Sequence, residues 1–445
     1  GELGSQRECM SKTVKKKVAL ISLGCAKNLV DSEVLLGGLK HENYTIVDEP
    51  ENSNIIIVNT CGFLDSAREE SVDVIIEAGE LKAGGDAEKV VVMGCFSDRY
   101  GTELRKELPE VDEFFGTSDH AEILSFLTGK EYAKKDPDYY RSLLTPNHYA
   151  YLKIAEGCDN GCSFCSIPIM RGLQKSQPLA WNIQQAKMLA DRGVKELLVI
   201  AQDSTSYGWD LQPKSTLHEL MTHLDKVEGL DWIRLHYAHP AHLHRDMIAQ
   251  FGQLEKLIPY IDMPIQHASD RLLKSMRRGL NSQGIRKRID ALRQANPDIA
   301  IRTSIIVGYP GETDKDFDQL YSFVEDVEFD RLGVFTYSEE EGTHAAFAMK
   351  DDIPTQIKYD RMDAIMMLQQ DINLMKNEQL VGHVEKIMID KNNDDGSSQG
   401  RTFRDSPEID NIVKIDGIHP VGEFLKVKFT SATEYEITGK KYHEK

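Results

Sequence analysis

Three cysteines in one short stretch constrain this chain more than any other feature of its sequence. Cys158, Cys162 and Cys165 are spaced by three and then two residues, which places three thiols in one tight loop. Closely spaced cysteines of this kind supply the thiolates of 4Fe–4S clusters. Three thiolates leave the fourth iron open, and an open position distinguishes a catalytic metal site from a closed structural one. The loop therefore predicts a catalytic iron–sulfur site.

A structural zinc site is the alternative reading of the same loop. It needs a fourth ligand, which His148 or the histidines after Arg234 could supply. Structural zinc sites of this kind usually carry paired CxxC or Cys/His groups, and the sequence has no second CxxC pair. A disulfide is disfavoured because three cysteines in one loop cannot all pair.

Composition places the chain among water-soluble globular proteins. Its 445 residues exceed one ordinary core and predict about three domains. No run approaches the ~18 apolar residues of a membrane span, and the polar, lysine-rich start does not resemble a signal peptide. Met10 is a candidate native start, in which case residues 1–9 are an expression scar. Seven cysteines without a signal peptide predict a reducing, cytoplasmic location.

The net charge of −19 bears on which kinds of partner the chain would bind. Nucleic-acid-binding proteins usually present a basic patch, whereas an acidic protein attracts basic proteins. An acidic composition can also serve solubility alone. The charge therefore favours a basic protein as partner only modestly.

Residues 14–130 read as a parallel α/β domain. Short, continuously apolar segments alternate with helices, which is typical of a parallel sheet covered on both faces. Strands are expected at 18–23, 55–60 and 89–93, and helices at 31–39, with Asp31 as N-cap, and at 65–81.

A cysteine follows each of these three strands, beside a glycine. Cys25, Cys61 and Cys95 should therefore converge, because the carboxyl ends of parallel strands share one edge of the sheet, where ligands bind. Three converging thiols predict a second cluster site with one open position. Three buried structural cysteines are the alternative.

Residues 131–148 are polar and read as a linker, and residues 149–375 as the second domain. Six apolar strand candidates separated by helices predict an incomplete (βα)6 TIM-like barrel, with chemistry at the carboxyl ends of the strands. The candidate strands are 151–155, 196–201, 232–237, 261–265, 301–307 and 331–337.

Several polar groups lie at those strand ends. Gln202 and Asp203 follow the second strand, and residues 308–312 follow the fifth. Arg302 is a candidate inward-pointing partner of a carboxylate. A basic turn at 275–279 would either meet substrate or form a solvated helix end. Four histidines crowd one further stretch: His236, His239, His242 and His244. Their spacing fits no helical face, so metal binding is disfavoured, and His236 or His239 is expected as a pocket-wall residue instead.

Residues 376–445 alternate with period two around a polar loop, which predicts a small antiparallel β-barrel. This segment holds eleven Lys and Arg against thirteen Asp and Glu. A barrel appended for RNA binding would be clearly basic, and this one is not.

The loop around Cys158, with aromatic Phe164 before the last cysteine, resembles the signature of radical S-adenosylmethionine (SAM) enzymes. A three-cysteine first domain, a central barrel and a small terminal barrel, called TRAM, together resemble the radical methylthiotransferases. Residues 22–33 and 59–65 are similar to the RimO type, which methylthiolates the β-carbon of an aspartate in ribosomal protein twelve of the small subunit.

The resemblance implies two 4Fe–4S clusters and SAM as cofactors. It places Phe164 near the adenine, Gln202 and Asp203 near the methionyl amino group, and the backbone at Gly308 against the adenine. One SAM would donate a methyl group to sulfur on the first cluster, and a second would be cleaved at the other cluster to yield a radical. An unactivated Cβ–H needs such chemistry, since no side-chain base is strong enough to remove its proton. We expect the two clusters to face one cavity.

The implied partners are a basic ribosomal protein of the small subunit as substrate and a reductant protein, with no membrane. The nearest alternative is a tRNA adenosine methylthiotransferase, under which tRNA would be the partner. A non-catalytic iron–sulfur scaffold and a zinc-binding adaptor are the alternatives from other classes.

Overall fold

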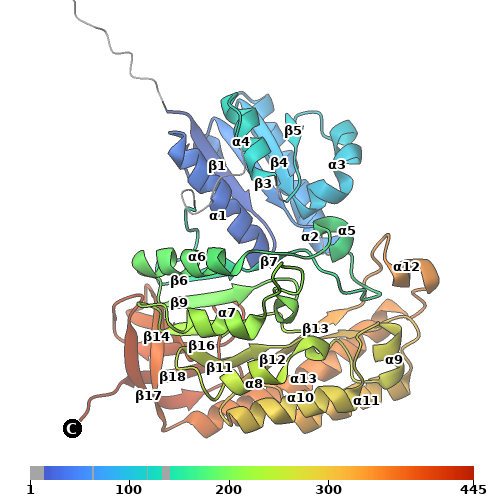
Figure 1. The fold of residues 1–445 in the computed structure, drawn as a ribbon, viewed down its shortest axis with the longest axis vertical. Coiled ribbons are helices and arrows are strands. Elements are labelled where there is room, and N and C mark those ends of the chain that lie inside the picture. Colours follow the sequence, from blue (N-terminus) through green and yellow to red (C-terminus); the bar gives the residue numbers. More distant parts are fainter. Residues whose placement is uncertain (1–14, 63–64, 118, 133–140) are drawn as a thin grey trace, which may run out of the picture. The chain divides into compact units, whose positions relative to one another are not determined.

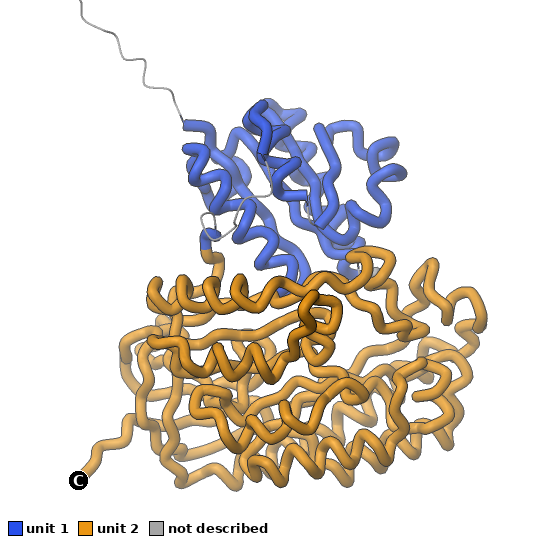
Figure 2. Tube along the Cα trace, viewed as in Figure 1, with its two compact units in different colours: residues 1–142 blue, residues 143–445 orange. Residues whose placement is uncertain are grey.

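The structure is a computed structural model that describes residues 15–62, 65–117, 119–132 and 141–445. Its contacts divide the chain into two compact units, residues 1–142 and 143–445 (Figure 2). The expression scar expected at residues 1–9 and part of the predicted linker, residues 133–140, lie outside the described residues.

Unit 1 is the predicted parallel α/β domain (Figure 1). Its five strands pair in parallel in the order β2-β1-β3-β4-β5. The strands are β1 (Lys17–Ser22), β2 (Thr45–Ile46), β3 (Ile55–Thr60), β4 (Lys89–Gly94) and β5 (Glu113–Phe114). The helices are α1 (Ala26–His41), α2 (Asp65–Ala83), α3 (Cys95–Glu107) and α4 (His120–Thr128).

Two apolar layers hold this sheet, because its central strands are apolar on both faces. Ile57 and Met93 pack with Leu35 of α1 and Ile123 of α4 on one face. A second cluster on the other face joins alternate residues of β3 and β4 to Ile75 of α2 and to α3. The continuous apolar runs of the sequence are explained by this burial on both sides.

The start of α1 differs from the sequence prediction. The helix begins at Ala26 with Cys25 as its N-cap, so the assignment of Asp31 as N-cap is wrong. Gly24 adopts φ +86°, which turns the chain from the end of β1 directly into the helix. Asp31 therefore lies inside α1, and only residues 23–25 separate the strand from the helix.

Unit 2 contains six parallel strands in the order β13-β12-β11-β10-β9-β6, as the six strand candidates predicted. The strands are β6 (Tyr149–Lys153), β9 (Glu196–Ile200), β10 (Trp232–Leu235), β11 (Leu257–Asp262), β12 (Ala300–Val307) and β13 (Arg331–Thr336). The helices are α5 (Ile167–Arg171), α6 (Leu179–Asp191), α7 (Leu217–Leu224), α8 (Arg245–Gln250), α9 (Asp270–Ser275), α10 (Ser282–Ala295), α11 (Asp314–Val327), α12 (His344–Ala348) and α13 (Thr355–Leu380).

Strand β11 lies nearer the amino terminus than predicted. The apolar run 261–265 suggested the strand, but β11 ends at Asp262, just before Pro264. The strand itself contains Pro259, which has no N–H to donate and lies where the pairing of β10 with β11 shifts register. Strand β6 likewise begins at Tyr149, two residues before the predicted start, where it pairs with Glu196 of β9.

The terminal strands form a closed five-stranded barrel, as predicted, but it is not wholly antiparallel, because β16 and β18 pair in parallel. They are β14 (Val384–Asn392), β15 (Ser397–Arg401), β16 (Ile412–Asp416), β17 (Phe424–Ala432) and β18 (Glu436–Lys441). Its interior is filled by aliphatic side chains and Phe429. The predicted fold class is therefore confirmed: a parallel α/β domain, a second α/β domain with six parallel strands, and a small β-barrel. None of the helices in the described part of the chain has the length and apolar character to cross a lipid bilayer.

A buried charge network joins this barrel to the amino ends of the parallel strands. Glu196, at the start of β9, accepts hydrogen bonds from Arg401 of β15 and Arg234 of β10. The Arg401 Nη2–Glu196 Oε1 distance is 2.6 Å, and both side chains are buried. Arg401 also pairs with Asp390. A buried carboxylate needs such partners because desolvation otherwise penalises its charge.

The loop between β15 and β16 adds further polar contacts to the parallel strands. Arg331 pairs with Asp405, and Arg302 pairs with Asp410. The expectation that Arg302 reaches a carboxylate is thus confirmed. His236 contacts the Ser406 hydroxyl at 2.8 Å. This loop therefore occupies one end of the six-stranded barrel.

Candidate functional site

The first three cysteines lie at one edge of the sheet in unit 1. Cys25 follows β1, Cys61 follows β3 and Cys95 begins α3 directly after β4. These three strands are neighbours in the sheet. A Cβ built on Gly24 would lie 2.7 Å from Cys61 Cβ and 3.0 Å from its Sγ, so the turn before Cys25 packs against Cys61.

Asn28 of α1 connects the three strand ends. Its Nδ2 donates to the Leu23 and Thr60 carbonyls at 3.0 and 2.8 Å. Its Oδ1 accepts from the Cys95 thiol at 3.7 Å. Asn28 is only 1% exposed, so water does not compete for these bonds. One buried amide therefore fixes the spacing of the edge that carries Cys25, Cys61 and Cys95.

The backbone at this edge leaves no room for side chains. Gly94 has φ +101°, and a Cβ there would lie 2.4 Å from the Thr60 carbonyl oxygen. Glycine is thus required for β4 to run beside Thr60 and deliver Cys95. On the neighbouring strand, the Ser71 hydroxyl of α2 bonds both the N–H and the carbonyl of Cys61.

The second group of cysteines occupies one loop in unit 2, closed at its base by a two-stranded ribbon. The ribbon pairs β7 (Ala155–Glu156) with β8 (Lys175–Ser176). Gly157 has φ +74°, and Cys158 N donates to the Gly172 carbonyl at 3.1 Å. A Cβ on Gly157 would overlap the Leu173 carbonyl, so only glycine fits where the loop begins.

Ionic contacts hold the residue before this loop. The two carboxylate oxygens of Glu156 form ion pairs with Lys153 Nζ and Arg171 Nη1, each at 2.6 Å. Burial opposes ionisation of Glu156, but the two cations outweigh it and lower its pKa to about 2. The loop therefore starts from a fixed, charged anchor.

The three thiols of the loop interact electrostatically. Burial raises the pKa of Cys158 to about 11 and that of Cys165 to about 12. The negative charge of a Cys162 thiolate raises both pKa values further, and that of a Cys158 thiolate raises the pKa of Cys165. Without a metal the Cys158 and Cys165 thiols are neutral near physiological pH, and a bound cation would supply the charge that favours their thiolate forms.

Backbone and side-chain donors point at the sulfur atoms. Asn160 N lies 3.4 Å from Cys158 Sγ, and Ile167 N lies 3.4 Å from Cys165 Sγ. Arg278 Nη1 lies 3.3 Å from Cys162 Sγ. The basic turn at 275–279 is therefore not wholly solvated: Arg277 is exposed, whereas Arg278 is buried against the cysteine loop.

Asp203 connects the loop to the end of β9. Its Oδ2 accepts from Asn160 Nδ2 at 2.9 Å and contacts His242 Nδ1 at 2.7 Å. Although burial opposes ionisation, hydrogen bonds from His242 and Thr205 hold the pKa of Asp203 well below its usual range. Asp203, expected at a cofactor site, thus also positions the loop through Asn160.

Gln202 carries an unused donor beside this network. Its Nε2 is buried and has no hydrogen-bond partner among the described residues. A buried amide donor without a partner is costly, so a native site usually supplies an acceptor from a ligand or water. The position suits a polar ligand at the carboxyl end of β9.

Phe164 packs into an apolar layer beside the cysteine loop. Its ring contacts a cluster that includes Met276, Tyr309 and Tyr337. Below it, the Ser163 and Tyr309 hydroxyls are 2.7 Å apart. The aromatic residue predicted beside the adenine therefore lies on a rigid apolar support.

Gly308 also lies at a strand end, where a buried carboxylate fixes the turn. Glu312 Oε1 accepts from Gly308 N at 2.9 Å and from Arg361 Nη1 at 2.8 Å. Its other oxygen contacts His267 Nε2 at 2.7 Å. Gly308 has φ +76°, and a Cβ would overlap the side chain of Lys358. Glu312 thus holds the turn that precedes α11, whose N-cap is Thr313.

The histidine-rich stretch is used for local structure. His239 and His244 accept backbone N–H groups two residues ahead, His242 contacts Asp203, and His236 contacts Ser406. Burial and the nearby charge of Arg278 lower the pKa of His239 to about 3, so its ring is neutral near physiological pH. These contacts agree with pocket-wall roles.

Across residues 15–62, 65–117, 119–132 and 141–445, no three His, Cys, Asp or Glu side chains are gathered closely enough to hold one metal ion. A cubane cluster binds each thiolate to a different iron, so it needs three thiols around a larger body. The cysteine loop fits that requirement: three coupled thiols, one donor to each sulfur, and an orphaned Gln202 amide nearby.

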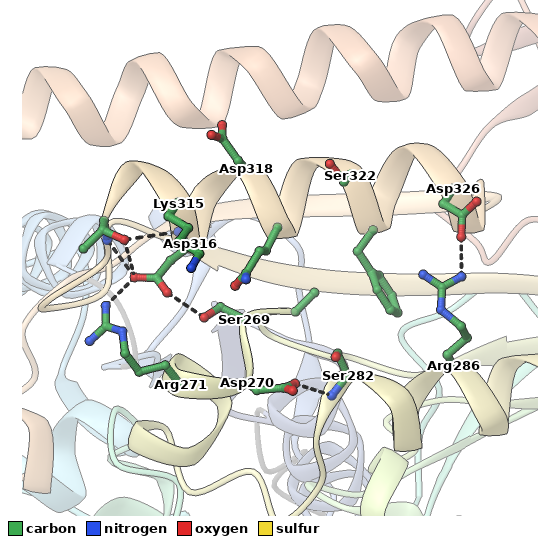
Figure 3. A pocket seen from close by; sticks show the side chains of 14 residues that line it. Ser269, Asp270, Arg271, Ser282, Arg286, Lys315, Asp316, Asp318, Ser322 and Asp326 are labelled. Carbon is green, nitrogen blue, oxygen red and sulfur yellow. Dashed lines mark hydrogen bonds and ion pairs between the residues drawn. The ribbon is translucent and has the colours of Figure 1, made fainter.

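The cavities of unit 2 include one that lies away from the cysteine loop. This pocket of about 730 Å³ lies between α9, α10 and α11 (Figure 3). Among its charged side chains, Asp316 accepts hydrogen bonds from Ser269 and Arg271, and Arg286 pairs with Asp326. None of the six cysteines of the predicted cluster sites lines this pocket.

Sequence reasoning missed four residues of these sites: Asn28, Asn160, Glu156 and Arg361. Asn28 and Asn160 resemble ordinary helix and turn residues in the sequence. Glu156 stands directly before the cysteine motif, and this adjacency was the one available signal. Arg361 reaches Glu312 from α13, and the sequence carries no sign of that contact.

Comparison with protein families agrees with this three-part organisation. Residues 17–116 match the family described as uncharacterized protein family UPF0004, residues 152–324 the radical SAM superfamily, and residues 381–441 the TRAM domain. The fold and the cysteine loop thus define a radical SAM protein with an added amino-terminal domain and a terminal TRAM barrel.

Full-length relatives identify the family. The chain is 45% identical to ribosomal protein uS12 methylthiotransferase RimO of Christiangramia forsetii, covering 96% of this chain and 95% of that protein. RimO proteins of Prosthecochloris aestuarii and Aquifex aeolicus are 46% and 45% identical, covering 96% and 95% of this chain and 99% and 97% of theirs. The chain belongs to the RimO family of radical SAM methylthiotransferases, and it is an enzyme of that class.

Solved structures share the fold at low sequence identity. The radical SAM methyltransferase TsrM from Kitasatospora setae, solved with cobalamin and a 4Fe–4S cluster, superposes with a TM-score of 0.55 at 13% identity. The match covers 75% of this chain and 77% of TsrM. The cobalamin-dependent enzyme OxsB gives 0.51 at 12% identity, covering 80% of this chain and 56% of OxsB.

Proposed function

We propose that this enzyme methylthiolates the β-carbon of an aspartate in ribosomal protein uS12, using SAM and two 4Fe–4S clusters. The observation that carries the proposal is the presence of two cysteine groups at strand ends in a chain of the RimO family. Cys25, Cys61 and Cys95 would hold one cluster. Cys158, Cys162 and Cys165 would hold the other.

The clusters and SAM, when bound, would supply the radical chemistry that side chains cannot. The chain's residues would hold and orient them. Asn28 would set the spacing of the first ligand group, and Glu156 and Asp203 would anchor the second. Phe164 would provide an apolar wall for the adenine, beside the turn at Gly308.

Polar groups at the end of β9 suit the methionyl part of SAM. Gln202 has an unused buried donor, and Asp203 is an ionised carboxylate that could accept from an ammonium group. That both clusters face one cavity stays a prediction. The domain boundaries 14–130, 131–148, 149–375 and 376–445 also remain proposals.

The partners follow from the proposed reaction. The substrate would be a basic ribosomal protein, attracted to a chain of net charge −19, and a reductant protein would supply electrons. A cytoplasmic location follows from a ribosomal substrate. The near-neutral TRAM segment gives no support to the tRNA alternative, in which a basic surface would be expected.

The test is anaerobic reconstitution followed by reaction with SAM and reductant. We expect roughly eight irons per chain with matching sulfide, and a mass gain of one S-methyl group on uS12 but not on tRNA. Zinc without sulfide would exclude the two-cluster assignment. Modified tRNA with unmodified uS12 would favour the alternative function.

A further inference from the structure

Arg278 is a buried cation held against the cysteine loop of unit 2. It follows α9 in a turn where Arg277 has φ +60° and Gly279 has φ +74°. The turn also binds the loop through its backbone, since Ser163 N donates to the Met276 carbonyl at 3.1 Å. This unusual backbone path leaves Arg277 exposed and buries Arg278 to 7% exposure.

The guanidinium contacts are specific but incomplete. Nη1 donates to Cys162 Sγ at 3.3 Å, and Nη2 donates to the Pro264 carbonyl at 2.7 Å. Nε is buried and has no hydrogen-bond partner among the described residues. No carboxylate lies within ion-pair distance of Arg278 in the described part of the chain. A buried cation without a carboxylate partner is costly unless an anion occupies the site.

The other two sulfur atoms receive donors of a different kind. Cys158 and Cys165 accept from backbone N–H groups, which are neutral. Cys162 is the thiol that accepts from a charged side chain. Hydrogen bonds to ligand sulfurs and local charge are among the features that set the reduction potential of an iron–sulfur cluster.

We infer that Arg278 is a positioning residue that raises the reduction potential of the cluster held by Cys158, Cys162 and Cys165. The inference rests on the proposed function. One electron, delivered by the reductant protein, adds one negative charge to the cluster and its thiolates. A fixed cation at Cys162 Sγ stabilises that added charge in a water-poor site, so reduction becomes easier.

The experiment isolates this cluster in the full chain. Replacement of the first trio in C25A/C61A/C95A leaves four irons, whose reduction is followed by electron paramagnetic resonance in a redox titration without SAM. In that background, R278Q should hold about tenfold less reduced cluster at a fixed potential, which is a shift of about 59 mV to more negative values for a one-electron couple. R278K keeps the positive charge but lacks the planar guanidinium group with its several donors. Its cluster potential should therefore lie between those of the parent chain and R278Q.

The matched control is R277Q, which removes the same charge from the exposed neighbour and should leave the potential unchanged. An unchanged potential in R278Q, or an equal shift in R277Q, would overturn the inference. So would a higher SAM requirement with no change in the SAM-free potential, because that result assigns Arg278 to SAM binding alone.

If R278Q does not retain four irons, R278M takes its place as the variant without the charge: a potential equal to that of the parent chain overturns the inference, and a more negative one supports it. If C25A/C61A/C95A itself binds no cluster while remaining folded, the proposed function fails, and Arg278 loses its role with it.

Discussion

The two cysteine groups use the same number of ligands but reach their geometry in opposite ways. In unit 1 each cysteine comes from a different strand end, and the buried amide of Asn28 connects those ends. In unit 2 all three cysteines share one loop that a short ribbon closes. The first site therefore depends on the packing of a whole sheet, whereas the second depends mainly on local turns and the donors around them.

The largest expected effect separates the chemical roles of the two sites. C162A should keep the iron of the first site and lose all reductive cleavage of SAM to 5′-deoxyadenosine. C61A should keep that cleavage and yield no methylthiolated uS12. Iron analysis, chromatography of deoxyadenosine and mass spectrometry of uS12 measure these outcomes. Retained cleavage in C162A would contradict the assignment of the loop.

A smaller effect tests the dependence of the first site on sheet packing. N28A removes the three hydrogen bonds of the Asn28 side chain, which costs about 2 kcal/mol and loosens the three strand ends. We expect partial loss of the first site's iron in C158A/C162A/C165A, the background that lacks the loop ligands. N52A, in an exposed side-chain contact of the same unit, serves as control. Equal iron in N28A and N52A would remove Asn28 from the site.

The buried charge network of Glu196, Arg234 and Arg401, which lies in the same unit as the second site, can be tested separately. R401M leaves the buried Glu196 carboxylate with Arg234 alone, which should destabilise unit 2 by about 3 kcal/mol. All three tryptophans, Trp181, Trp209 and Trp232, lie in unit 2, so their fluorescence during denaturation follows that unit. K426M breaks only an exposed pair with Glu444 and should change little. Similar unfolding curves for both variants would contradict the network's role.

The smallest effect is a pH dependence in the same network. Burial opposes ionisation of Asp390, but hydrogen bonds from His148 and Arg401 lower its pKa below 3.8. Its contribution to stability is therefore present above the unfolded value and is lost as the pH falls through the folded pKa. D390N should cost about 2 kcal/mol near neutral pH.

The measurement compares thermal midpoints of wild type and D390N as the pH is lowered. The difference should narrow as the pH falls below 3.8, because the unfolded wild-type chain takes up a proton at Asp390 while the folded chain still holds this carboxylate ionised. A difference that stays constant across this range would show that the charge of Asp390 does not carry the effect.

The sequence predicted elements whose pattern is local. Strand 55–60 matches β3 at both ends, because its apolar run ends directly at the cysteine. The convergence of the strand-end cysteines followed from parallel topology alone. The helix start at Asp31 failed because a positive φ at Gly24, which no propensity reveals, begins α1 five residues earlier.

Contacts between distant segments could not be predicted in this way. Glu196 and Arg401 are 205 residues apart, and Arg278 reaches a sulfur 116 residues away. A single sequence gives no sign of which charged residue meets which. The pair Arg277 and Arg278 illustrates the limit: identical neighbours in the sequence have opposite exposure in the structure.

The contact between the TRAM barrel and the parallel strands has a consequence for protein engineering. A terminal barrel grafted from a distant homologue would have to bring its own equivalents of Arg401 and Asp405. Without them, Glu196 would keep one of its two arginines and Arg331 would lose its carboxylate. Chimaeras intended to exchange substrate preference should therefore carry the recipient's contact residues across the junction, or they will fail for reasons unrelated to recognition.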